Sequence, residues 1–437
     1  MAEIETLMEL AKGVEGALPS RQSRQQGVTL PQVDEVEAEQ IAEPLPEFPR
    51  LPGALGQLVD GITGDIPYDH KALAAITYMG IGLAGKVKLL GEPWLQPRFY
   101  SCLVGKAGGG KSAGEFEVRR ALCHGEPVVL PHVFVEYSID SGPALVQALE
   151  ENRRIILAPD ELADQFEKAR ATVGGRNSLT GELLRLYESN ETGNHTKKVR
   201  GVGGNLMLSD AMFSLIGGVA TERFESMWIG TNSQASGLKS RFVLSYSEKD
   251  IPRLRTPNND ELINDSLRKL ASVVNGDIGL GELAEPQSVR QIRLNEEAQR
   301  EIGSWRCFDD DGAEVMRRVL DMAKRFCLVV VACEGLNAID GATMRMGLQF
   351  ADYQIALREK LFALDASSYV QAFENRILKF CERHGQSSAP RVLNSIKPDR
   401  WPGGFASYNQ AFAALIRAGK LQTVAKTRKG ECVWALQ

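Results

Sequence analysis

Eight consecutive residues in the first third of the chain have the types and spacing of a phosphate-binding loop. They fit the pattern G-x-x-x-x-G-K-[ST] at every fixed position. The glycines allow backbone N–H groups to point inward at a β-phosphate, the lysine reaches the β- and γ-phosphates, and the serine hydroxyl holds Mg²⁺. The loop therefore predicts a site for ATP with Mg²⁺, rather than a glycine-rich turn that carries a lysine by chance. The residues assigned to this site are Gly105, Gly108, Gly109, Gly110, Lys111 and Ser112.

The segments on either side of this loop fit its geometry. Residues 98–104 are aromatic and apolar, which predicts a buried strand, and residues 112–123 carry apolar side chains at helical spacing. A strand that enters the loop and a helix that leaves it place the helix N-terminus at the phosphates, where its partial positive charge favours an anion.

A pair of adjacent carboxylates follows a second apolar strand. Residues 155–159 are apolar, and Asp160 and Glu161 come directly after them. We expect Asp160 to bind Mg²⁺, directly or through water, and Glu161 to orient and activate the attacking water. This arrangement favours hydrolysis over phosphoryl transfer to a metabolite. The alternative is that the two acids only cap the following helix, whose dipole favours negative charge at its start.

Arginines are the candidates for stabilising charge on the transferred phosphate. Arg241 directly precedes an apolar strand, and we expect it to reach the nucleotide of a neighbouring copy. Arg223 is the competing candidate, and a surface ion pair is the alternative reading of Arg241. Thr221 is the predicted polar sensor at the end of the strand of residues 212–217. Arg325 is predicted to reach the γ-phosphate from a helical lid, although a solvated helix face explains it equally well.

A basic segment lies between the carboxylate strand and the sensor strand. His195, Lys197, Lys198 and Arg200 precede a glycine-rich stretch, which predicts a basic hairpin. In a ring-shaped protein such a hairpin faces the central channel and contacts the backbone of single-stranded DNA. A basic surface loop is the alternative.

The C-terminal residues 367–437 predict three helices followed by a two-stranded hairpin, which is the pattern of a winged helix. Residues 371–437 contain 11 Lys and Arg against 4 Asp and Glu. The turn of the hairpin is basic, with Lys426, Arg428 and Lys429, so contact with duplex DNA phosphates is predicted. Contact with a protein is the alternative.

The pattern of elements predicts an α/β protein with a mostly parallel sheet, of the P-loop NTPase class. Five segments are expected. They are an acidic, mostly disordered leader (1–48) that carries one short amphipathic helix, a helical N-terminal domain (49–96), the P-loop ATPase core (97–254), a helical lid (255–366) and the winged helix (367–437).

Composition narrows the class of protein. The 437 residues are 43% hydrophobic and 24% charged, as in ordinary globular proteins, and the net charge is −5. Residues 1–48 hold 10 acidic against 3 basic residues, so the chain is polarised from an acidic start to a basic end. The seven cysteines form no C-x-x-C pair. No apolar run approaches the roughly 18 residues of a membrane span. We therefore expect a cytoplasmic protein with no membrane partner.

Taken together, these motifs resemble the domain-of-unknown-function 3987 family, which comprises P-loop ATPases of phages, plasmids and other mobile elements. The resemblance covers most of residues 48–335. It is carried by Phe48-Pro49, Leu51 to Leu55, Gly105 to Ser112, Leu157 to Leu162, Leu183 to Glu188, Leu215 to Gly218 and Ser240-Arg241-Phe242. The family looks akin to superfamily 3 and MCM-like ring helicases, which implies a hexamer with Arg241 reaching across the interface between copies. No primase motif precedes the loop, so the resemblance implies that any primase is a separate protein.

The sequence thus predicts a ring-forming, ATP-dependent DNA translocase or helicase for the replication of a mobile element, with single-stranded DNA in its channel. A regulatory ATPase that binds DNA without unwinding it, such as a helicase loader or a recombination or defence protein, is the alternative. An ATP-switched assembly scaffold is a third hypothesis.

Overall fold

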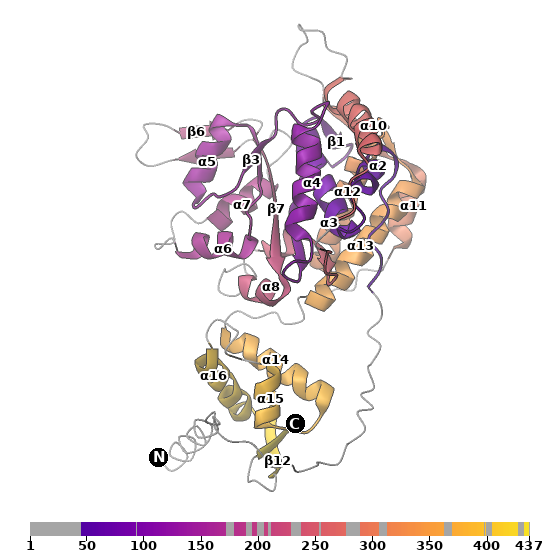
Figure 1. The fold of residues 1–437 in the computed structure, drawn as a ribbon. Helices are drawn as coiled ribbons and strands as arrows, with labels where there is room; N and C mark the ends of the chain where they lie inside the picture. The colour runs from indigo at the N-terminus through magenta and orange to yellow at the C-terminus, as the bar shows by residue number, and fades with distance from the viewer. Residues whose placement is uncertain are drawn as a thin grey trace. The chain divides into compact units, whose positions relative to one another are not determined.

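A computed structural model of the chain describes most of the residues from Leu45 onward (Figure 1). The described ranges are 45–92, 94–171, 179–188, 195–198, 205–208, 211–228, 237–252, 255–276, 289–305, 313–361, 369–396, 398, 404–426 and 432–436. The expected acidic leader, with its short helix, lies outside these residues except for its last four.

A five-stranded parallel sheet forms the centre of the fold, so the α/β prediction with a mostly parallel sheet is confirmed. Its spatial order is β3-β4-β7-β2-β8. The strands are β2 (Tyr100–Gly105), β3 (Phe134–Glu136), β4 (Arg154–Leu157), β7 (Met212–Ala220) and β8 (Phe242–Ser247). Because all five run parallel, their carboxyl ends meet at one edge, which is where open α/β sheets bind ligands. β2 is buried along its whole length, as expected for a strand covered on both faces.

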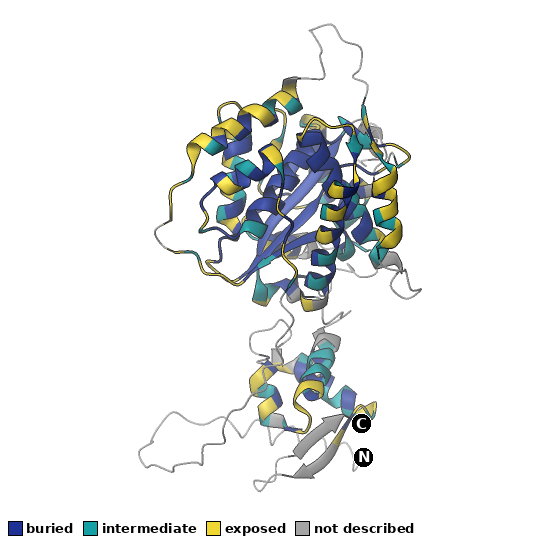
Figure 2. Cartoon of the chain, turned by 90° about the vertical axis from the view of Figure 1, so that its right-hand side faces the viewer, coloured by how far each residue is buried: buried dark blue, intermediate teal, exposed yellow. Residues whose placement is uncertain are grey.

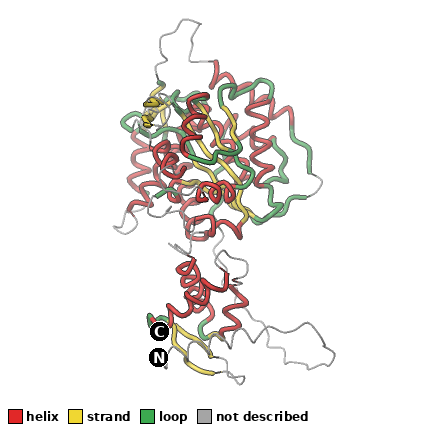
Figure 3. The backbone as a smooth tube through the Cα atoms, turned by 90° about the vertical axis from the view of Figure 1, so that its left-hand side faces the viewer, coloured by secondary structure: helices red, strands yellow, loops and turns green. Residues whose placement is uncertain are grey.

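Helices cover both faces of this sheet (Figures 1 and 3). Helix α3 (Tyr68–Leu83) lies against one face. Its Thr77 hydroxyl group forms a hydrogen bond with the hydroxyl group of Ser101 in β2, and its His70 imidazole forms one with the hydroxyl group of Ser245 in β8. Beside α3 on this face lies α4 (Lys111–His124). The other face carries α6 (Leu162–Ala171), α7 (Leu179–Glu188) and α8 (Thr221–Trp228). There Tyr100, Phe166, Trp228 and Phe242 form a chain of aromatic contacts. Figure 2 shows the sheet buried beneath helices whose outer faces are exposed.

A second, three-stranded parallel sheet joins two parts of the sequence that we expected to form separate domains. β9 (Arg290–Leu294) lies between β1 (Val87–Leu89) and β10 (Ala338–Ile339). Residues 255–366, expected to form a helical lid, are mainly helical but also contribute the strands β9 and β10, which the sequence did not predict. The predicted boundaries after residues 96 and 254 also do not divide the packing, because residues from Phe48 to Leu361 share one hydrophobic core. The helices of these regions are α2 (Gly53–Gly61), α10 (Asp260–Ala271), α11 (Glu296–Ser304), α12 (Ala313–Cys333) and α13 (Gly341–Leu361).

Shorter elements complete the first 361 residues. α5 (Gly142–Glu151) starts at Ser141, whose side chain accepts a hydrogen bond from the Ala144 N–H, and it leads into β4. β5 (His195–Lys198) and β6 (Asn205–Leu208) form an antiparallel pair. A 3₁₀ turn, η1 (Lys239–Arg241), precedes β8, and a π-helical turn, η2 (Ser272–Gly276), follows α10.

The C-terminal elements have a hydrophobic core of their own, which includes Phe373, Ile377, Val392 and Leu415. The order along the chain is α14 (Tyr369–His384), β11 (Ser387–Ser388), α15 (Ala389–Ile396), α16 (Gly404–Arg417), β12 (Leu421–Lys426) and β13 (Cys432–Leu436). The strands pair antiparallel in the order β11-β13-β12. Among the described residues of the chain, none of the helices has the length and apolar character that a membrane span requires.

Candidate functional site

The glycine loop lies at the carboxyl edge of the central sheet, between the end of β2 and the start of α4. Gly108 and Gly110 have φ angles of +79° and +81°, a region that side chains with a Cβ rarely adopt. A Cβ atom on Gly109 would come within 3.0 Å of the Lys106 carbonyl oxygen. Gly110 is the residue before the first turn of α4, so the glycines allow the backbone to wrap closely around the helix N-terminus. Ser112, in that first turn, is exposed.

The Lys111 side chain bends back over this loop. Its ammonium group donates to the carbonyl oxygens of Gly105 at 2.9 Å and Lys106 at 2.6 Å. Its stem lies against β7, because a Cβ atom on Gly218 would sit 3.3 Å from the Lys111 Cβ. Burial lowers the pKa of Lys111, while the nearby carboxylates of Glu161 and Glu222 act in the opposite direction. Lys111 is thus a largely buried cation whose partners are backbone carbonyls.

The carboxylate pair lies at the end of β4, next to β7. Asp160 is exposed, and it is close enough to Glu115 of α4 to contribute to the raised pKa of that residue. Glu161 is partly buried, and its burial raises the pKa of the carboxyl group, while Arg223, an Ala220 N–H and Lys111 oppose the rise. Glu161 also directly precedes α6, as the helix-capping alternative expected. The structure therefore brings Glu161 to the same edge as Lys111.

Two polar oxygens at this edge have no hydrogen-bond partner among the described residues. They are Oε1 of Glu161, which follows β4, and Oγ1 of Thr221, which follows β7. Both atoms are buried, and a buried polar atom without a partner costs about 1–3 kcal/mol. Sites of this kind in folded proteins commonly bind water, an ion or a ligand. The ends of β2, β4 and β7 thus present a cation, a carboxylate and a hydroxyl group beside a glycine cradle. An exposed hydroxyl and an exposed carboxylate, Ser112 and Asp160, are oxygen donors of the type that Mg²⁺ prefers.

Arg223 is the arginine that lies beside this group. It sits in the first turn of α8, and its Nη1 atom is 3.9 Å from Oε1 of Glu161. Its Nη2 atom donates to Asp164 at 2.7 Å and to Glu167 at 3.2 Å. The guanidinium therefore joins α8 to α6 at the carboxyl edge of the sheet.

Arg241 and Arg325 lie at the opposite edge, which disagrees with the predicted contact of Arg325 with the γ-phosphate, whereas the predicted role of Arg241 at a neighbouring copy stays a prediction. Arg241 precedes β8, is 4% exposed and donates to the Gly237 carbonyl oxygen at 2.7 Å. Its guanidinium is therefore buried within the chain in this conformation. Arg325, on α12, is 5% exposed and donates to the carbonyl oxygens of Gln96 and Arg98, just before β2.

The length of β2 explains why Arg325 cannot serve the loop. The carbonyls that it binds precede the strand, and Gly105 ends it, a separation of roughly 20 Å at 3.3 Å per residue. Arg325 and Arg241 instead flank the ring of Tyr187, with the guanidinium carbons 4.5 Å and 5.7 Å from its centroid. Both cations stabilise the packing of α7 at the amino edge of the sheet.

The sequence reasoning missed His70, which lies beneath the glycine loop. The side chain is fully buried on α3, and its Nδ1 atom is 2.8 Å from the Ser245 hydroxyl oxygen. Its Nε2 atom would lie 3.5 Å from a Cβ atom on Gly105. Burial, and secondarily the Lys111 charge, lowers the pKa of His70 to about 3. A histidine at the start of an apolar helix was the only signal in the sequence.

His70 is expected to make the folded state sensitive to acid. Because its pKa falls from 6.5 in the unfolded chain to about 3 in the folded one, only the unfolded chain takes up this proton as the pH falls below 6.5. Between pH 6.5 and pH 4.5, this difference in proton uptake should lower the free energy of unfolding by about 2.5 kcal/mol. Urea unfolding of His70→Gln at both pH values should show a smaller loss than the wild type. His132→Gln, at an exposed histidine, is the control and should follow the wild type.

The predicted DNA-contacting residues are described only in part. His195, Lys197 and Lys198 form β5, where they pair with Leu208, Leu206 and Asn205 of β6. Lys426 ends β12, opposite Cys432. Arg200, Arg428 and Lys429 lie outside the described residues. An antiparallel strand pair is therefore present at the first of these segments, and at the second the paired strands β12 and β13 precede and follow residues 427–431 in the sequence.

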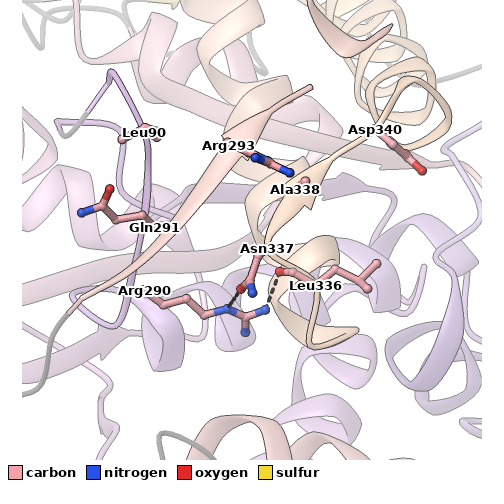
Figure 4. Close-up of a pocket in the computed structure, with 8 residues that line it drawn as sticks. All are labelled: Leu90, Arg290, Gln291, Arg293, Leu336, Asn337, Ala338 and Asp340. Atoms are coloured by element: carbon pink, nitrogen blue, oxygen red, sulfur yellow. Dashed lines mark hydrogen bonds between the residues drawn. The ribbon is translucent and has the colours of Figure 1, made fainter. Parts of the chain in front are cut away.

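A pocket of about 670 Å³ lies on the three-stranded sheet (Figure 4). Within it, Nε of Arg290 donates to the Asn337 side chain at 2.5 Å, and Arg290 also donates to the Leu336 carbonyl oxygen. None of its lining residues belongs to the glycine loop, the carboxylate pair or α8, and we assign the candidate site to the loop because Lys111, Glu161 and Thr221 lie together there. The lining residues are Leu90, Arg290, Gln291, Arg293, Leu336, Asn337, Ala338 and Asp340.

The search among known proteins adds no assignment to this geometry: no protein-family model and no curated protein matches the chain.

Proposed function

We propose that this chain is a Mg²⁺-dependent ATPase with a P-loop NTPase core. One observation carries the proposal: Lys111, Glu161 and Thr221 converge at the carboxyl ends of three adjacent parallel strands, beside a glycine loop at a helix N-terminus. The loop's N–H groups and Lys111 would hold the phosphates, and Ser112 with Asp160 would hold Mg²⁺. The metal would supply charge neutralisation between the β- and γ-phosphates.

The residues of this chain would act on the attacking water and on the phosphate. Glu161 would accept a hydrogen bond from the water and orient its oxygen toward the γ-phosphorus. The Thr221 hydroxyl would donate a hydrogen bond to a phosphate oxygen or to that water. Lys111 would exchange the carbonyls of Gly105 and Lys106 for phosphate oxygens, which carry more negative charge.

We propose further that the ATPase acts on DNA as a ring-forming translocase or helicase, as the resemblance to the 3987 family implies. The antiparallel β5–β6 pair, with its lysines, supports a strand-gripping hairpin. The helix–strand–helix–helix–strand–strand order of residues 369–436 supports a C-terminal winged helix. The burial of Arg241 favours the second candidate, a DNA-binding regulatory ATPase that does not unwind, because a ring motor of this type needs that arginine at the interface between copies.

The hairpin separates these two functions. Changing Lys197 and Lys198 together to alanine removes two cations that would contact the strand. In a translocase, this variant should lose the stimulation of ATP hydrolysis by single-stranded DNA and the unwinding of a forked duplex, and keep its basal hydrolysis. Phosphate release and strand separation, with and without DNA, measure both quantities.

A charge-matched pair on α10, Arg268→Ala with Lys269→Ala, is the control and should behave as the wild type. The regulatory function is favoured if the wild type hydrolyses ATP and binds DNA, but DNA does not change the rate of hydrolysis and the protein does not unwind the duplex. A wild type that hydrolyses no nucleoside triphosphate with Mg²⁺ would refute the ATPase itself.

A further inference from the structure

Of the three arginines suggested by the sequence, Arg223 alone lies at the edge that holds Lys111 and Glu161. We propose that Arg223, acting within the same chain, is the arginine that stabilises the charge on the transferred phosphate. This inference rests on the proposed ATPase function, and the expected contribution of Arg241 from a neighbouring copy stays a separate prediction.

The position of α8 places this guanidinium beside the groups that would handle the phosphate. Helix α8 begins at Thr221, directly after β7, so Arg223 is two residues beyond the partnerless Thr221 hydroxyl. Its Nη1 atom is within ion-pair distance of Glu161, at 3.9 Å. The adjacent Glu222 is close enough to Lys111 to affect its pKa. The first turn of α8 therefore borders both the loop lysine and the carboxylate.

Two carboxylates of α6 hold the guanidinium at this edge. Asp164 and Glu167 lie three residues apart on one face of α6, and both accept a hydrogen bond from Nη2. A guanidinium has five N–H donors in a planar fork that matches carboxylate and phosphate oxygens. The side chain is 37% exposed, so a ligand can approach it, in contrast to the nearly buried Arg241. Asp164 and Glu167 thus hold the Arg223 guanidinium at the edge of the sheet where the candidate site lies.

The reaction that this arginine would assist is a balanced displacement. The water oxygen bonds to the γ-phosphorus while the bond from that phosphorus to the bridging oxygen breaks, and its electron pair leaves with ADP. The proton of the water passes to Glu161 and then to solvent. Negative charge grows on the bridging and γ-phosphate oxygens, and a cation aimed there stabilises the transition state more than the ground state.

Mixing two inactive variants distinguishes an arginine of the same chain from one of a neighbouring copy. Lys111→Ala lacks the loop lysine, and Arg223→Ala lacks the arginine. Within one chain, neither variant can complete the other, so the mixture should hydrolyse ATP no faster than the sum of its parts. Recovery of turnover in the mixture would overturn the proposal. Arg223→Gln, which removes the charge but keeps a polar group and the first part of the side-chain stem, serves if the alanine variant does not fold.

Binding of a transition-state analogue gives a readout that does not depend on turnover. With ADP, Mg²⁺ and aluminium fluoride, Arg223→Ala should bind the ternary complex at least about tenfold more weakly than the wild type, since analogues report contacts made in the transition state. Its affinity for ADP with Mg²⁺ alone should change less than about twofold, and Arg223→Lys should restore part of the loss. Arg268→Gln, at an exposed ion-paired arginine, is the matched control.

Equal binding of the analogue by wild type and Arg223→Ala would sink this inference and leave the ATPase intact. Failure of the wild type to bind ADP with Mg²⁺ would sink both. A merely structural role for Arg223 would weaken ADP and the analogue alike, and that result would also count against the proposal.

Discussion

Replacing Lys111 with alanine should reduce ATP hydrolysis by about a thousandfold or more. The ammonium group of Lys111 lies over the glycine loop, where it donates to two loop carbonyls at 2.9 Å and 2.6 Å. A preorganised donor at developing charge contributes about 10²–10³ in kcat by itself, and a phosphate-binding lysine also contributes to binding. Steady-state phosphate release at saturating ATP, together with nucleotide titration, separates the two contributions.

Lys106 offers a matched control within the same loop. Its side chain is exposed, and only its backbone carbonyl contacts Lys111. Lys106→Ala should therefore keep turnover within a few-fold of the wild type, as is usual for surface substitutions. Comparable losses in both variants would mean that the loop responds to charge in general, and the assignment of Lys111 to the phosphates would fail.

Replacing Gln354 with leucine should lower the free energy of unfolding by about 3 kcal/mol. Gln354 lies on α13, is fully buried, and bonds both backbone groups of one residue on the edge strand β8. Its Oε1 atom accepts from the Leu244 N–H at 2.9 Å, and its Nε2 atom donates to the Leu244 carbonyl oxygen at 2.8 Å. Leucine would leave both groups buried without a partner, at about 1–3 kcal/mol each.

Urea unfolding followed by circular dichroism measures this loss. The control is Gln349→Leu on the same helix, at an exposed position, which should change the unfolding midpoint little. An equal unfolding midpoint for Gln354→Leu and the wild type would show that the Leu244 N–H and carbonyl groups find other hydrogen-bond partners. The side chain of Gln354 takes the place that a further strand would occupy.

The elements around the glycine loop were predictable because their signals are local. A buried strand, a loop with fixed glycines and an amphipathic helix are encoded within about 25 residues, and β2 and α4 begin within two residues of the predicted positions. The adjacent acids at the end of β4 are local in the same sense. The structure adds that Lys111, Glu161 and Thr221 lie at one edge of the sheet. They do so because each comes after the carboxyl end of one of three adjacent parallel strands.

The second sheet and the arginines were not predictable from local patterns. β1 and β10 have only three and two residues, too short for a period of two to be visible, and β9 is the only longer strand of that sheet. Arg241 and Arg325 have the sequence context of functional arginines, yet Arg241 is buried against the Gly237 carbonyl oxygen, four residues earlier, and Arg325 binds carbonyl oxygens from a distant part of the chain. A motif fixes the residue type, whereas tertiary packing decides at which edge of the sheet the side chain ends.

The pairing of β1 with β9 has a consequence for how the chain matures on the ribosome. Val87 of β1 is in register with Arg290 of β9, so β1 can pair only after about 200 further residues have been synthesised. At about 5–20 residues per second, translation takes roughly 10–40 s to supply it. During that interval the side of β1 that pairs with β9 has no strand partner, and a chaperone that shields nascent chains would be expected to act on this stretch.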